Sequence, residues 1–430
     1  MSKEKKIKGK VFQTPKGMHD VVPSESLYWE KIESVVKNIS KEHNFSHIET
    51  PILEFADLYN KTTGDSSDIV HKEMYILKTK GDDVLALRPE YTPGICRAYL
   101  EHKLNKQGQP QKLFALGPVF RHDRPQLGRY RQFTQAEFDI LGGIADPIYD
   151  AELISMAIRI LSELKIKNVI VKINSVGCKT CRPVFKKQLQ NYYKNNERKL
   201  CSDCRRRLYE NPLRLLDCKN ESCVKLKENA PVFFDKLCSS CTDHFKSVLE
   251  YLDEANIPYS LDNNLVRGLD YYNRTVFEIF ADGEEEKIGA LGGGGRFDYL
   301  MEIIGGSSTS AVGFSLGVER IIAVLKARGI DFQKKAPKRI FFAHAGELAK
   351  KKAFSIINYL RNEGIVVLES LTKESLSSQL KLADKEKIEI AIILGQKEIF
   401  ENNVIVRDLV AGTQETIPLE KLLNDIKRRM

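Results

Sequence analysis

The stretch "KLFALGPVFRHDRPQLGRYRQFTQAEFDILG" (residues 112–142) decides the fold class. Its two ends predict strands, and the middle predicts a basic loop that joins them. In the second strand Gln135, Glu137 and Asp139 alternate with three apolar residues, so the acidic and amide side chains share one face. Such a face is either half solvated or lines a cleft, and the arginine-rich loop beside it favours a cleft.

The sequence before this pair predicts a mixture of helices and short strands. Residues 23–45 have the apolar periodicity of an amphipathic helix, with Ser24 as its N-cap. A strand is expected over residues 47–53, and residues 74–79 and 84–89 flank "KGDD" as a hairpin. A further helix is expected from Thr92 to about residue 104, with Pro93 in its first turn.

The sequence after the pair predicts three further parts. Residues 178–250 are basic, rich in cysteine and mostly helical, and residues 311–329 read as a strand followed by a helix that Gly329 closes. Residues 332–339 resemble a linker, and the remainder alternates strands with helices as a βαβαβ module. The predicted fold is therefore an α+β body (residues 1–177 and 251–332) with a helical insertion (178–250) and a C-terminal α/β domain (337–430).

The composition is that of a globular protein with several domains. The chain has 430 residues, of which 42% are hydrophobic and 29% charged, and its formal net charge is +9. We expect no membrane span, because no apolar run is long enough. The basic N-terminus has no apolar core of a secretory signal, so a cytoplasmic protein is expected. The positive charge concentrates in residues 178–250, which favours a polyanionic partner over a merely solvated face.

Three arginines and a glycine run suggest a site for an anion. Arg121 follows a predicted strand, Arg267 precedes a glycine, and Arg320 opens a predicted helix. Arginine keeps its charge and binds phosphate through two hydrogen bonds, although any one of these could serve in a surface ion pair. The run "GGGG" at residues 292–295 fits no phosphate-binding motif, so it is either a flexible turn or a place where the backbone approaches a ligand closely.

Five segments in order resemble the class II aminoacyl-tRNA synthetases, and among them the histidyl-tRNA synthetases. "FSHIETPILE" is similar to motif 1, with Pro51 at the interface of a homodimer. "GPVFRHDRPQLGRYRQF" is similar to motif 2, and "AVGFSLGVERI" to motif 3. "LVRGLDYYNRTVFE" and the glycine-rich segment are similar to the two signatures of the histidyl enzymes. The resemblance implies an antiparallel catalytic sheet flanked by helices, and an anticodon-binding C-terminal domain.

The resemblance also implies an activity and a set of site residues. The enzyme would attach L-histidine to tRNA(His) through a histidyl-adenylate, using ATP with Mg²⁺. Arg267 would offset charge at the α-phosphate, while Arg121 and Arg320 would bind the ATP phosphates. Asp139 and Tyr272 would bind the two ring nitrogens, because a neutral imidazole offers one donor and one acceptor. The residues expected around histidine are Glu90, Tyr91, Thr92, Arg121, Gln135, Asp139, Arg267, Tyr271 and Tyr272.

The motif 2 loop carries the remaining expectations. Arg124 and Gln126 are the candidates for contact with the acceptor end of the tRNA. Asp123 stands where the family commonly has glutamate, which puts its contact with adenine in doubt because the arm is one methylene shorter. Asp139 is likewise shorter than the glutamate of some relatives, and Tyr91 replaces a residue that is often glycine.

Eight of the nine cysteines form four pairs, which are typical of structural zinc. The spacings suit two sites of four thiolates, although small buried residues in helices are the alternative. Disulfides are not expected in a cytosolic chain. The paired cysteines are Cys178, Cys181, Cys201, Cys204, Cys218, Cys223, Cys238 and Cys241, and Cys96 is expected in a helix core.

Two functions other than that of a synthetase are the alternatives. A regulatory relative of this fold would bind histidine without acylating tRNA, and it would lack the C-terminal domain and the arginine of "RGLDYY". A nucleic-acid-binding protein with a dead site would have lost Arg121, Arg267 or Arg320. The chain retains all of these features, which favours the enzyme.

Overall fold

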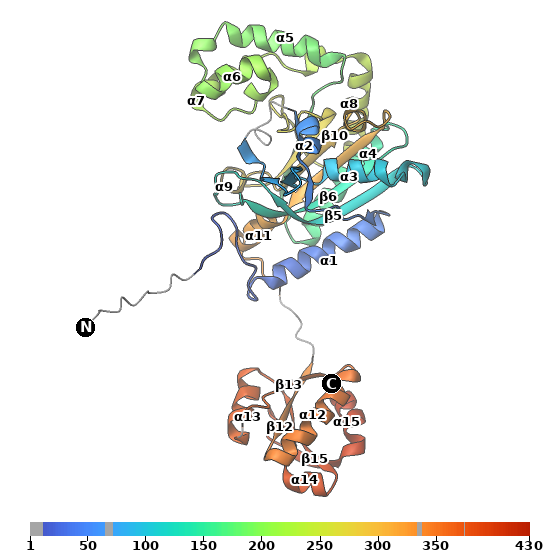
Figure 1. Cartoon of the computed structure of the whole chain (residues 1–430), viewed down its shortest axis with the longest axis vertical. Coiled ribbons are helices and arrows are strands. Elements are labelled where there is room, and N and C mark those ends of the chain that lie inside the picture. The colour runs from blue at the N-terminus through green and yellow to red at the C-terminus, as the bar shows by residue number, and fades with distance from the viewer. Residues whose placement is uncertain (1–11, 65–71, 333–337, 374) are drawn as a thin grey trace, which may run out of the picture. The chain divides into compact units, whose positions relative to one another are not determined.

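The computed structural model describes residues 12–64, 72–332, 338–373 and 375–430. The chain divides into two compact units, Met1–Phe332 and Gln333–Met430 (Figure 1). The basic N-terminal stretch and most of the predicted linker lie outside the described residues. Each unit is considered by itself below.

The first unit is built on a mixed sheet of eight strands among the described residues. The two edge pairs, β1/β5 and β7/β8, are parallel, and the neighbours between them are antiparallel. The prediction of an antiparallel sheet is therefore correct only for the central strands. In sheet order the strands are β1 (Ser46–His47), β5 (Gln111–Phe120), β6 (Gln132–Leu141), β11 (Ala311–Gly317), β10 (Gly292–Arg296), β9 (Asn273–Ala281), β7 (Val169–Ser175) and β8 (Tyr259–Leu261).

The quoted stretch forms the hairpin β5–β6, as predicted, and its register sets one face of the site. Asp139 lies opposite Gly313 of β11, and Gln135 lies opposite Gly317. Because side chains alternate along a strand, Gln135, Glu137 and Asp139 share a face. All three are buried, so the face lines the interior rather than water.

The glycine run forms a central strand, and its interpretation as a flexible turn is wrong. Strand β10 pairs with β9 on one side and β11 on the other. Its backbone hydrogen bonds are therefore satisfied within the sheet, which a turn would not allow. The absence of side chains leaves space above the sheet, and the site described below uses this space.

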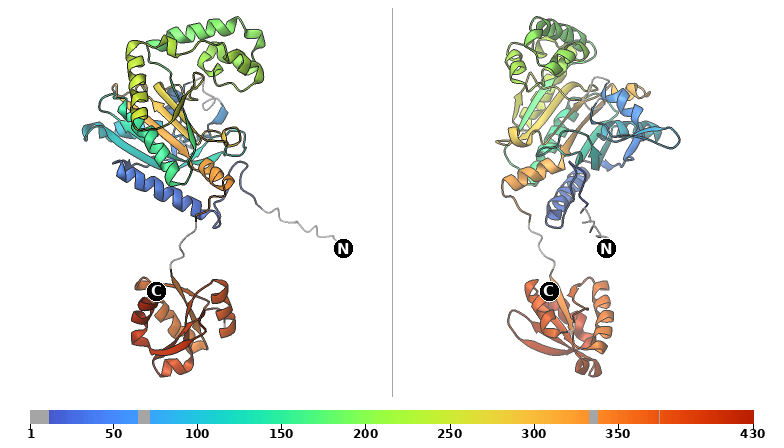
Figure 2. Two further views of the ribbon diagram at one scale, coloured as in Figure 1. Left: turned by 180° about the vertical axis from the view of Figure 1, so that it is seen from behind. Right: turned by 60° about the vertical axis from the view of Figure 1, so that its left-hand side comes forward.

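Helices cover the sheet and bury its apolar face in one core (Figure 2). In α1 (Ser26–Glu42), Ile32, Val36 and Ile39 face this core at helical spacing. The predicted N-cap is wrong, since the cap position is Glu25 and no side chain caps the helix. The other long helices are α4 (Ile148–Glu163), α8 (Ser239–Glu254) and α11 (Val318–Ala327), and the short ones are α9 (Glu285–Ile288) and α10 (Leu300–Ile303).

A smaller sheet, β2-β4-β3, adjoins the body. The predicted hairpin is confirmed as β3 (Ile76–Lys78) and β4 (Val84–Leu87), while the strand predicted over residues 47–53 is replaced by β1 and β2 (Leu53–Phe55). Pro51 lies between them, where its missing N–H would interrupt a strand ladder. Helix α2 (Ala56–Thr63) follows, and α3 (Thr92–Glu101) begins with Pro93 in its first turn, as predicted. Cys96 is buried in α3.

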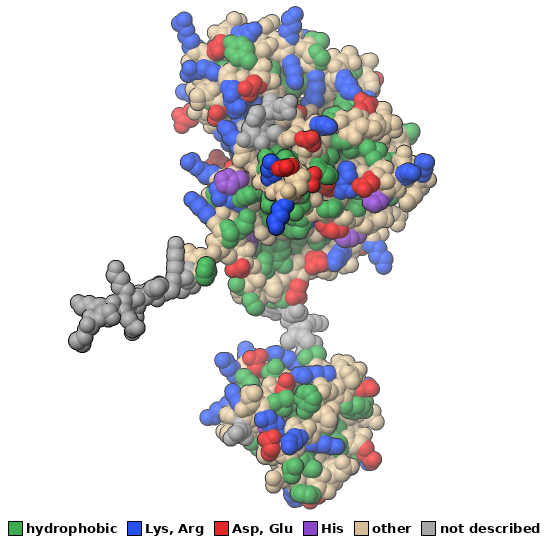
Figure 3. All heavy atoms as spheres, in the orientation of Figure 1, with side chains coloured by type: hydrophobic (Ala, Val, Ile, Leu, Met, Phe, Trp, Pro, Cys, Tyr) green, Lys and Arg blue, Asp and Glu red, His purple; other side chains and the backbone are tan. Residues whose placement is uncertain are grey.

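The Cys-rich segment is helical, as predicted, and stands at one end of the first unit (Figures 1 and 2). It comprises α5 (Cys181–Lys194), α6 (Ser202–Glu210), α7 (Glu221–Lys227) and the beginning of α8. Its interior contains Phe185, Leu189, Tyr193 and Leu208, all without exposed area. The far end of α8 packs on α4 of the body. Lysine and arginine side chains gather over these helices in Figure 3.

The second unit is the predicted α/β module. Strands β12 (Arg339–His344), β13 (Val366–Glu369) and β14 (Ile390–Leu394) pair in parallel, with α12 (Glu347–Asn362) and α13 (Leu376–Lys385) as connections. Two antiparallel strands, β15 (Asn403–Asp408) and β16 (Gln414–Pro418), extend the sheet. Helices α14 (Gln396–Phe400) and α15 (Leu422–Arg429) complete the unit. Among the residues described in both units, none belongs to a helix with the length and apolar character that a membrane span requires.

Candidate functional site

The polar face of β6 forms the floor of a buried acidic site. Asp139 has no exposed area, and within the described part of the chain neither of its carboxylate oxygens has a hydrogen-bond partner. The same holds for Oε1 of Glu90, at the entry to α3, and for Oε1 of Gln135. Buried acceptors normally have partners, so these atoms mark the place of a ligand or of ordered water.

The segment of residues 267–272, here called the histidine loop, closes this site from the side of β9. Tyr271 donates its hydroxyl hydrogen to Glu90 Oε2 at 2.7 Å, and the rings of Tyr271 and Tyr272 lie 4.7 Å apart. Arg267 Nη1 donates to Glu278 Oε1 at 2.6 Å, and its guanidinium carbon lies 5.4 Å from the centre of the Tyr272 ring. The structure thus brings the predicted arginine and both tyrosines to the acids of β6.

Two glycines make room for these side chains. A Cβ atom on Gly293 would lie 2.7 Å from Arg267 Nη1, and one on Gly313 would lie 2.0 Å from Asp139 Oδ1. Both distances are well below ordinary contact. The glycine strand therefore lets a guanidinium lie against the sheet. Close approach of this strand to a ligand, the second interpretation of the glycine run, stays a prediction.

The site contains three buried carboxyl groups that lie close together, those of Glu90, Glu137 and Asp139. Burial raises the pKa of Asp139 well above its ordinary value, and the charge of Glu90 adds to the effect. Burial likewise raises the pKa of Glu137, with Asp139 and Glu90 as the next causes. Thr92 Oγ1 donates to Glu137 Oε1 at 3.0 Å. A ligand with positive charge or N–H donors would satisfy these groups, because it offsets both the burial and the mutual repulsion.

Arginines gather on the other side of the histidine loop. Arg121 donates from Nε to Pro89 O at 2.8 Å, and Arg320 donates from Nε to Gly128 O at 2.8 Å and from Nη1 to Ala290 O. Burial and, after it, the charges of Arg129 and Arg121 lower the pKa of Arg320 to about 10. Several guanidinium groups held near one another by backbone carbonyls form a site that favours a multiply charged anion.

The loop between β5 and β6 folds as a tight turn that presents polar side chains to water. Gln126 and Arg129 exchange backbone hydrogen bonds of 3.1 and 2.8 Å, and both side chains are exposed. Asp123 accepts from the Arg124 N–H at 2.6 Å and from Arg129 Nη1 at 3.3 Å. The predicted tRNA candidates Arg124 and Gln126 are therefore exposed, whereas the carboxylate of Asp123 already has partners inside the loop.

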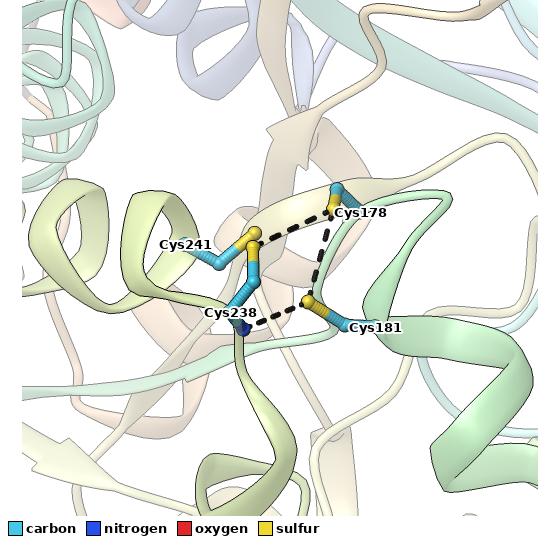
Figure 4. A group of neighbouring side chains, drawn as sticks. All are labelled: Cys178, Cys181, Cys238 and Cys241. Carbon is cyan, nitrogen blue, oxygen red and sulfur yellow. Dashed lines mark hydrogen bonds between the residues drawn. The ribbon is translucent and has the colours of Figure 1, made fainter.

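The eight paired cysteines form two clusters of four, which the sequence left ungrouped. Within each cluster all four sulfur atoms lie within 4.8 Å of one another. Cluster 1 (Cys178, Cys181, Cys238 and Cys241) joins the start of α5 to the start of α8 (Figure 4). Cluster 2 (Cys201, Cys204, Cys218 and Cys223) lies within the insertion. Each cluster thus combines two of the four pairs.

The sulfur separations suit a tetrahedral metal and exclude disulfides. The sulfur–sulfur distances are 3.7 Å for Cys178–Cys181, 3.9 Å for Cys178–Cys238 and 3.8 Å for Cys201–Cys218. A tetrahedral site with zinc–sulfur bonds of 2.3 Å requires sulfurs about 3.8 Å apart. A disulfide bond is only about 2 Å long.

Cluster 1 contains one thiol with a lowered pKa, that of Cys178, whereas burial raises the pKa of Cys181 and Cys241. Burial by itself would raise the pKa of Cys178, but hydrogen bonds from Cys181 and Thr180 together lower it to about 6. The Cys238 N–H donates to Cys181 Sγ at 3.1 Å. In cluster 2 burial opposes ionisation of Cys201, yet hydrogen bonds from Cys204, Cys223 and Cys218 lower its pKa. A lowered pKa prepares a cysteine for metal binding, since the thiolate is the ligand.

Comparison with known proteins identifies the family. A family model described as histidyl-tRNA synthetase matches residues 17–321, and one described as anticodon binding domain matches residues 339–429. The chain belongs to the histidyl-tRNA synthetase family. A histidine--tRNA ligase from Desulforamulus reducens is 42% identical over 418 residues, which cover 96% of this chain and 99% of the relative. The relative from Dehalococcoides mccartyi is 41% identical, over 98% of this chain and all of its own length.

Solved structures agree with the family's fold. The apo histidyl-tRNA synthetase of S. aureus matches with a TM-score of 0.80 and 32% identity, over 96% of this chain and 99% of its own. A Bacillus halodurans protein titled as an ATP phosphoribosyltransferase regulatory subunit/histidyl-tRNA synthetase has a TM-score of 0.63 at 19% identity, and it covers 90% of this chain and 99% of its own. The second likeness shows the fold alone.

The structure adds residues to the site to which the sequence analysis assigned no role. Glu137 is buried beside Asp139, Glu278 pairs with Arg267, and Arg129 lies close enough to Arg320 to lower its pKa. The alternating pattern placed Glu137 on the site face, but nothing in the sequence gave it a partner. Arg88 donates to the hydroxyl of Tyr91 at 2.5 Å, so that hydroxyl is already engaged. Direct contact of Tyr91 with histidine stays a prediction.

Proposed function

We propose that the chain attaches L-histidine to tRNA(His) in two steps, first forming histidyl-adenylate from histidine and ATP and then transferring histidine to the tRNA. AMP and pyrophosphate leave. The observation that carries this assignment is a cluster of buried acidic groups, with acceptors that have no partner among the described residues, beside a group of partly buried arginines. The α-ammonium group of an amino acid and the phosphates of a nucleotide fit these two groups of side chains.

Histidine is selected by acceptors that lack partners. Asp139 accepts from one ring nitrogen and Tyr272 binds the other, because a neutral imidazole needs one acceptor and one donor. Glu90, Glu137 and Gln135 receive the α-ammonium group, whose three N–H donors offset the carboxylates that burial disfavours. An amino acid without a matching side chain would leave buried polar groups unpaired, and this gives strong discrimination.

Adenylate formation needs positioning and charge stabilisation rather than a general base, since the carboxylate of histidine is already ionised. Arg267 lies against the sheet at Gly293 and would bind the α-phosphate as negative charge builds. Arg121 and Arg320 bind the other phosphates. Family members use ATP with Mg²⁺, and Glu278 offers a carboxylate oxygen of the kind that Mg²⁺ prefers.

Transfer to tRNA uses exposed residues of the first unit and the C-terminal domain. Arg124 and Gln126 are exposed in the loop between β5 and β6 and contact the acceptor end. Residues 339–429 match an anticodon-binding domain and take the other end of the tRNA. The basic helices of the insertion are available to the phosphate backbone.

A homodimer is supported by the small sheet β2-β4-β3. Among its described residues, large apolar side chains are exposed by 43–63% of their area at Leu53, Phe55, Ile76, Leu77 and Val84. The register puts Leu53, Phe55 and Leu77 on one face of this sheet and Ile76 and Val84 on the other. Exposed apolar side chains gathered on one face commonly mark an interface. Pro51, from the segment that resembles motif 1, lies just before β2.

Each cysteine cluster holds one structural zinc ion, so the chain binds two. The support is the match between the sulfur separations and tetrahedral coordination, together with the lowered pKa of Cys178 and Cys201. Cluster 1 joins the beginning of the insertion, at α5, to its last helix, α8. Elemental analysis of protein purified without added metal should give about two zinc ions per chain, and a value near zero in reducing buffer would contradict the assignment.

ATP–pyrophosphate exchange with each of the 20 amino acids tests the proposed function. Exchange should depend on L-histidine and should be absent or far weaker with the other amino acids. Histidine binding without exchange would favour the regulatory relative. Absence of both would favour a nucleic-acid-binding protein with a dead site.

A further inference from the structure

The insertion contacts the histidine loop through three side chains. Asn211 Nδ2 donates to Asp270 Oδ1 at 2.8 Å, and Arg182 Nη1 donates to the backbone carbonyl of Asp270 at 3.3 Å. Arg214 Nη1 donates to the backbone carbonyl of Arg267 at 3.4 Å. The loop that carries Arg267, Tyr271 and Tyr272 is thus held on its outer side by residues of the insertion.

These three contacts are polar and partly buried, which distinguishes them from ordinary surface packing. Asn211 is 4% exposed and Arg214 is 9% exposed, and Arg182 is half-buried. Burying polar side chains is unfavourable unless their hydrogen bonds are made. The three side chains therefore need the acceptors of the loop, and the same hydrogen bonds hold the loop in place.

Each contact lies next to a cysteine cluster. Arg182 directly follows Cys181 of cluster 1. Asn211 and Arg214 both lie in the segment between Cys204 and Cys218, two members of cluster 2. A metal ion that joins Cys204 to Cys218 would close this segment into a loop and restrict its backbone. The positions of the three side chains are therefore set by the parts of the insertion that the clusters fix.

We propose that Arg182, Asn211 and Arg214 are positioning residues for histidine activation, and that the two cysteine clusters, through these residues, keep the histidine loop in its closed arrangement. The inference rests on the proposed function, because it assigns the insertion a role in that reaction. None of the three residues touches the reacting atoms. They act through the backbone carbonyls of Arg267 and Asp270 and through the Asp270 side chain, on which the directions of Arg267 and of the two tyrosines depend.

The test uses the full chain and the variants Asn211→Ala and Arg214→Met. The matched control is Arg206→Met, which alters an arginine on α6 whose partner is Glu210 on the same helix. In ATP–pyrophosphate exchange each test variant should raise the KM for histidine about tenfold and lower kcat, while the KM for ATP changes less than twofold. Hydrogen exchange of the peptide covering residues 265–272 should become faster, and zinc content and thermal midpoint should match those of the control.

A double-mutant cycle separates positioning from general stability. Asn211→Ala and Asp270→Ala remove the same hydrogen bond, so the double variant should be scarcely worse than either single variant. Cys204→Ser, which weakens cluster 2, should raise the KM for histidine and speed exchange of the same peptide. Metal loss without either change would overturn the link from the clusters to the loop.

Two results separate this inference from the proposed function. A wild-type protein without histidine-dependent exchange would overturn the proposed function itself. An active wild type whose Asn211→Ala and Arg214→Met variants keep the KM for histidine and the slow exchange of residues 265–272 would overturn the inference alone. A fall in thermal midpoint with an unchanged KM would show a purely structural role and would also overturn it.

Discussion

The buried acidic site around Asp139 and the Cys-rich insertion are ordered by different physical means. The site lies on the central strands β6, β10 and β11, whose ladder hydrogen bonds fix the backbone on both sides. The insertion consists of short helices, and its four cysteine pairs converge into two clusters. The sheet therefore supplies rigidity from its own backbone, whereas the insertion, under the proposed zinc binding, depends on cross-links between side chains. Loss of a cross-link should affect the insertion first and the site through it.

Removal of metal from cluster 2 should produce the largest effect on stability. Structural zinc contributes about 10–16 kcal/mol of apparent binding free energy in small zinc domains, so a Cys201→Ser, Cys223→Ser variant should lose order in α6 and α7. Limited proteolysis should cut the variant within residues 195–230 while the body stays intact. If the variant and the wild type resisted proteolysis equally, the insertion would not depend on its cysteine clusters for order.

Replacement of Arg267 should have the largest effect on catalysis. Arg267→Ala removes a fixed cation from the site where charge builds on the α-phosphate, and such a loss lowers the rate by about 10²–10³, or about 3–4 kcal/mol. Binding of histidine and ATP should stay measurable by calorimetry. Single-turnover adenylation within threefold of the wild-type rate would remove Arg267 from the catalytic role.

The change Asp139→Asn should have a smaller effect, directed at histidine. It keeps the size of the side chain but removes a buried charge that has no partner among the described residues, and hydrogen bonds to charged groups are worth about 1.5–3 kcal/mol. The KM for histidine should rise more than the KM for ATP. An unchanged KM for histidine would show that Asp139 is not the ring contact.

The smallest effect is expected in the exposed loop. Gln126→Ala should impair aminoacylation of tRNA and spare ATP–pyrophosphate exchange, because one base contact is worth roughly 1–3 kcal/mol and the exchange needs no tRNA. Leu127→Ala is a matched control, since Leu127 is exposed in the same turn without polar groups. Equal loss in both assays would place Gln126 in support of adenylation instead.

The sequence predicts those features that depend on local pattern. The hairpin β5–β6, the polar face with Asp139 and the helical insertion follow from periodicity and turn signals, and all are present. The grouping of the cysteines was not predictable, because cluster 1 joins Cys178 to Cys241 across the whole insertion. The glycine strand also escaped prediction, since a glycine run has no side-chain pattern and its place in the sheet is fixed by β9 and β11. Likewise, contacts such as Asn211 to Asp270 depend on tertiary packing alone.

Charging of tRNA(His) with labelled L-histidine tests the central claim most directly. Wild-type protein with ATP and Mg²⁺ should form acid-precipitable histidyl-tRNA and release one AMP for each histidine transferred. The parallel reaction with Arg267→Ala should be slower by about 10²–10³. Histidine-dependent ATP–pyrophosphate exchange without any charged tRNA, or charging that does not depend on Arg267, would contradict the account.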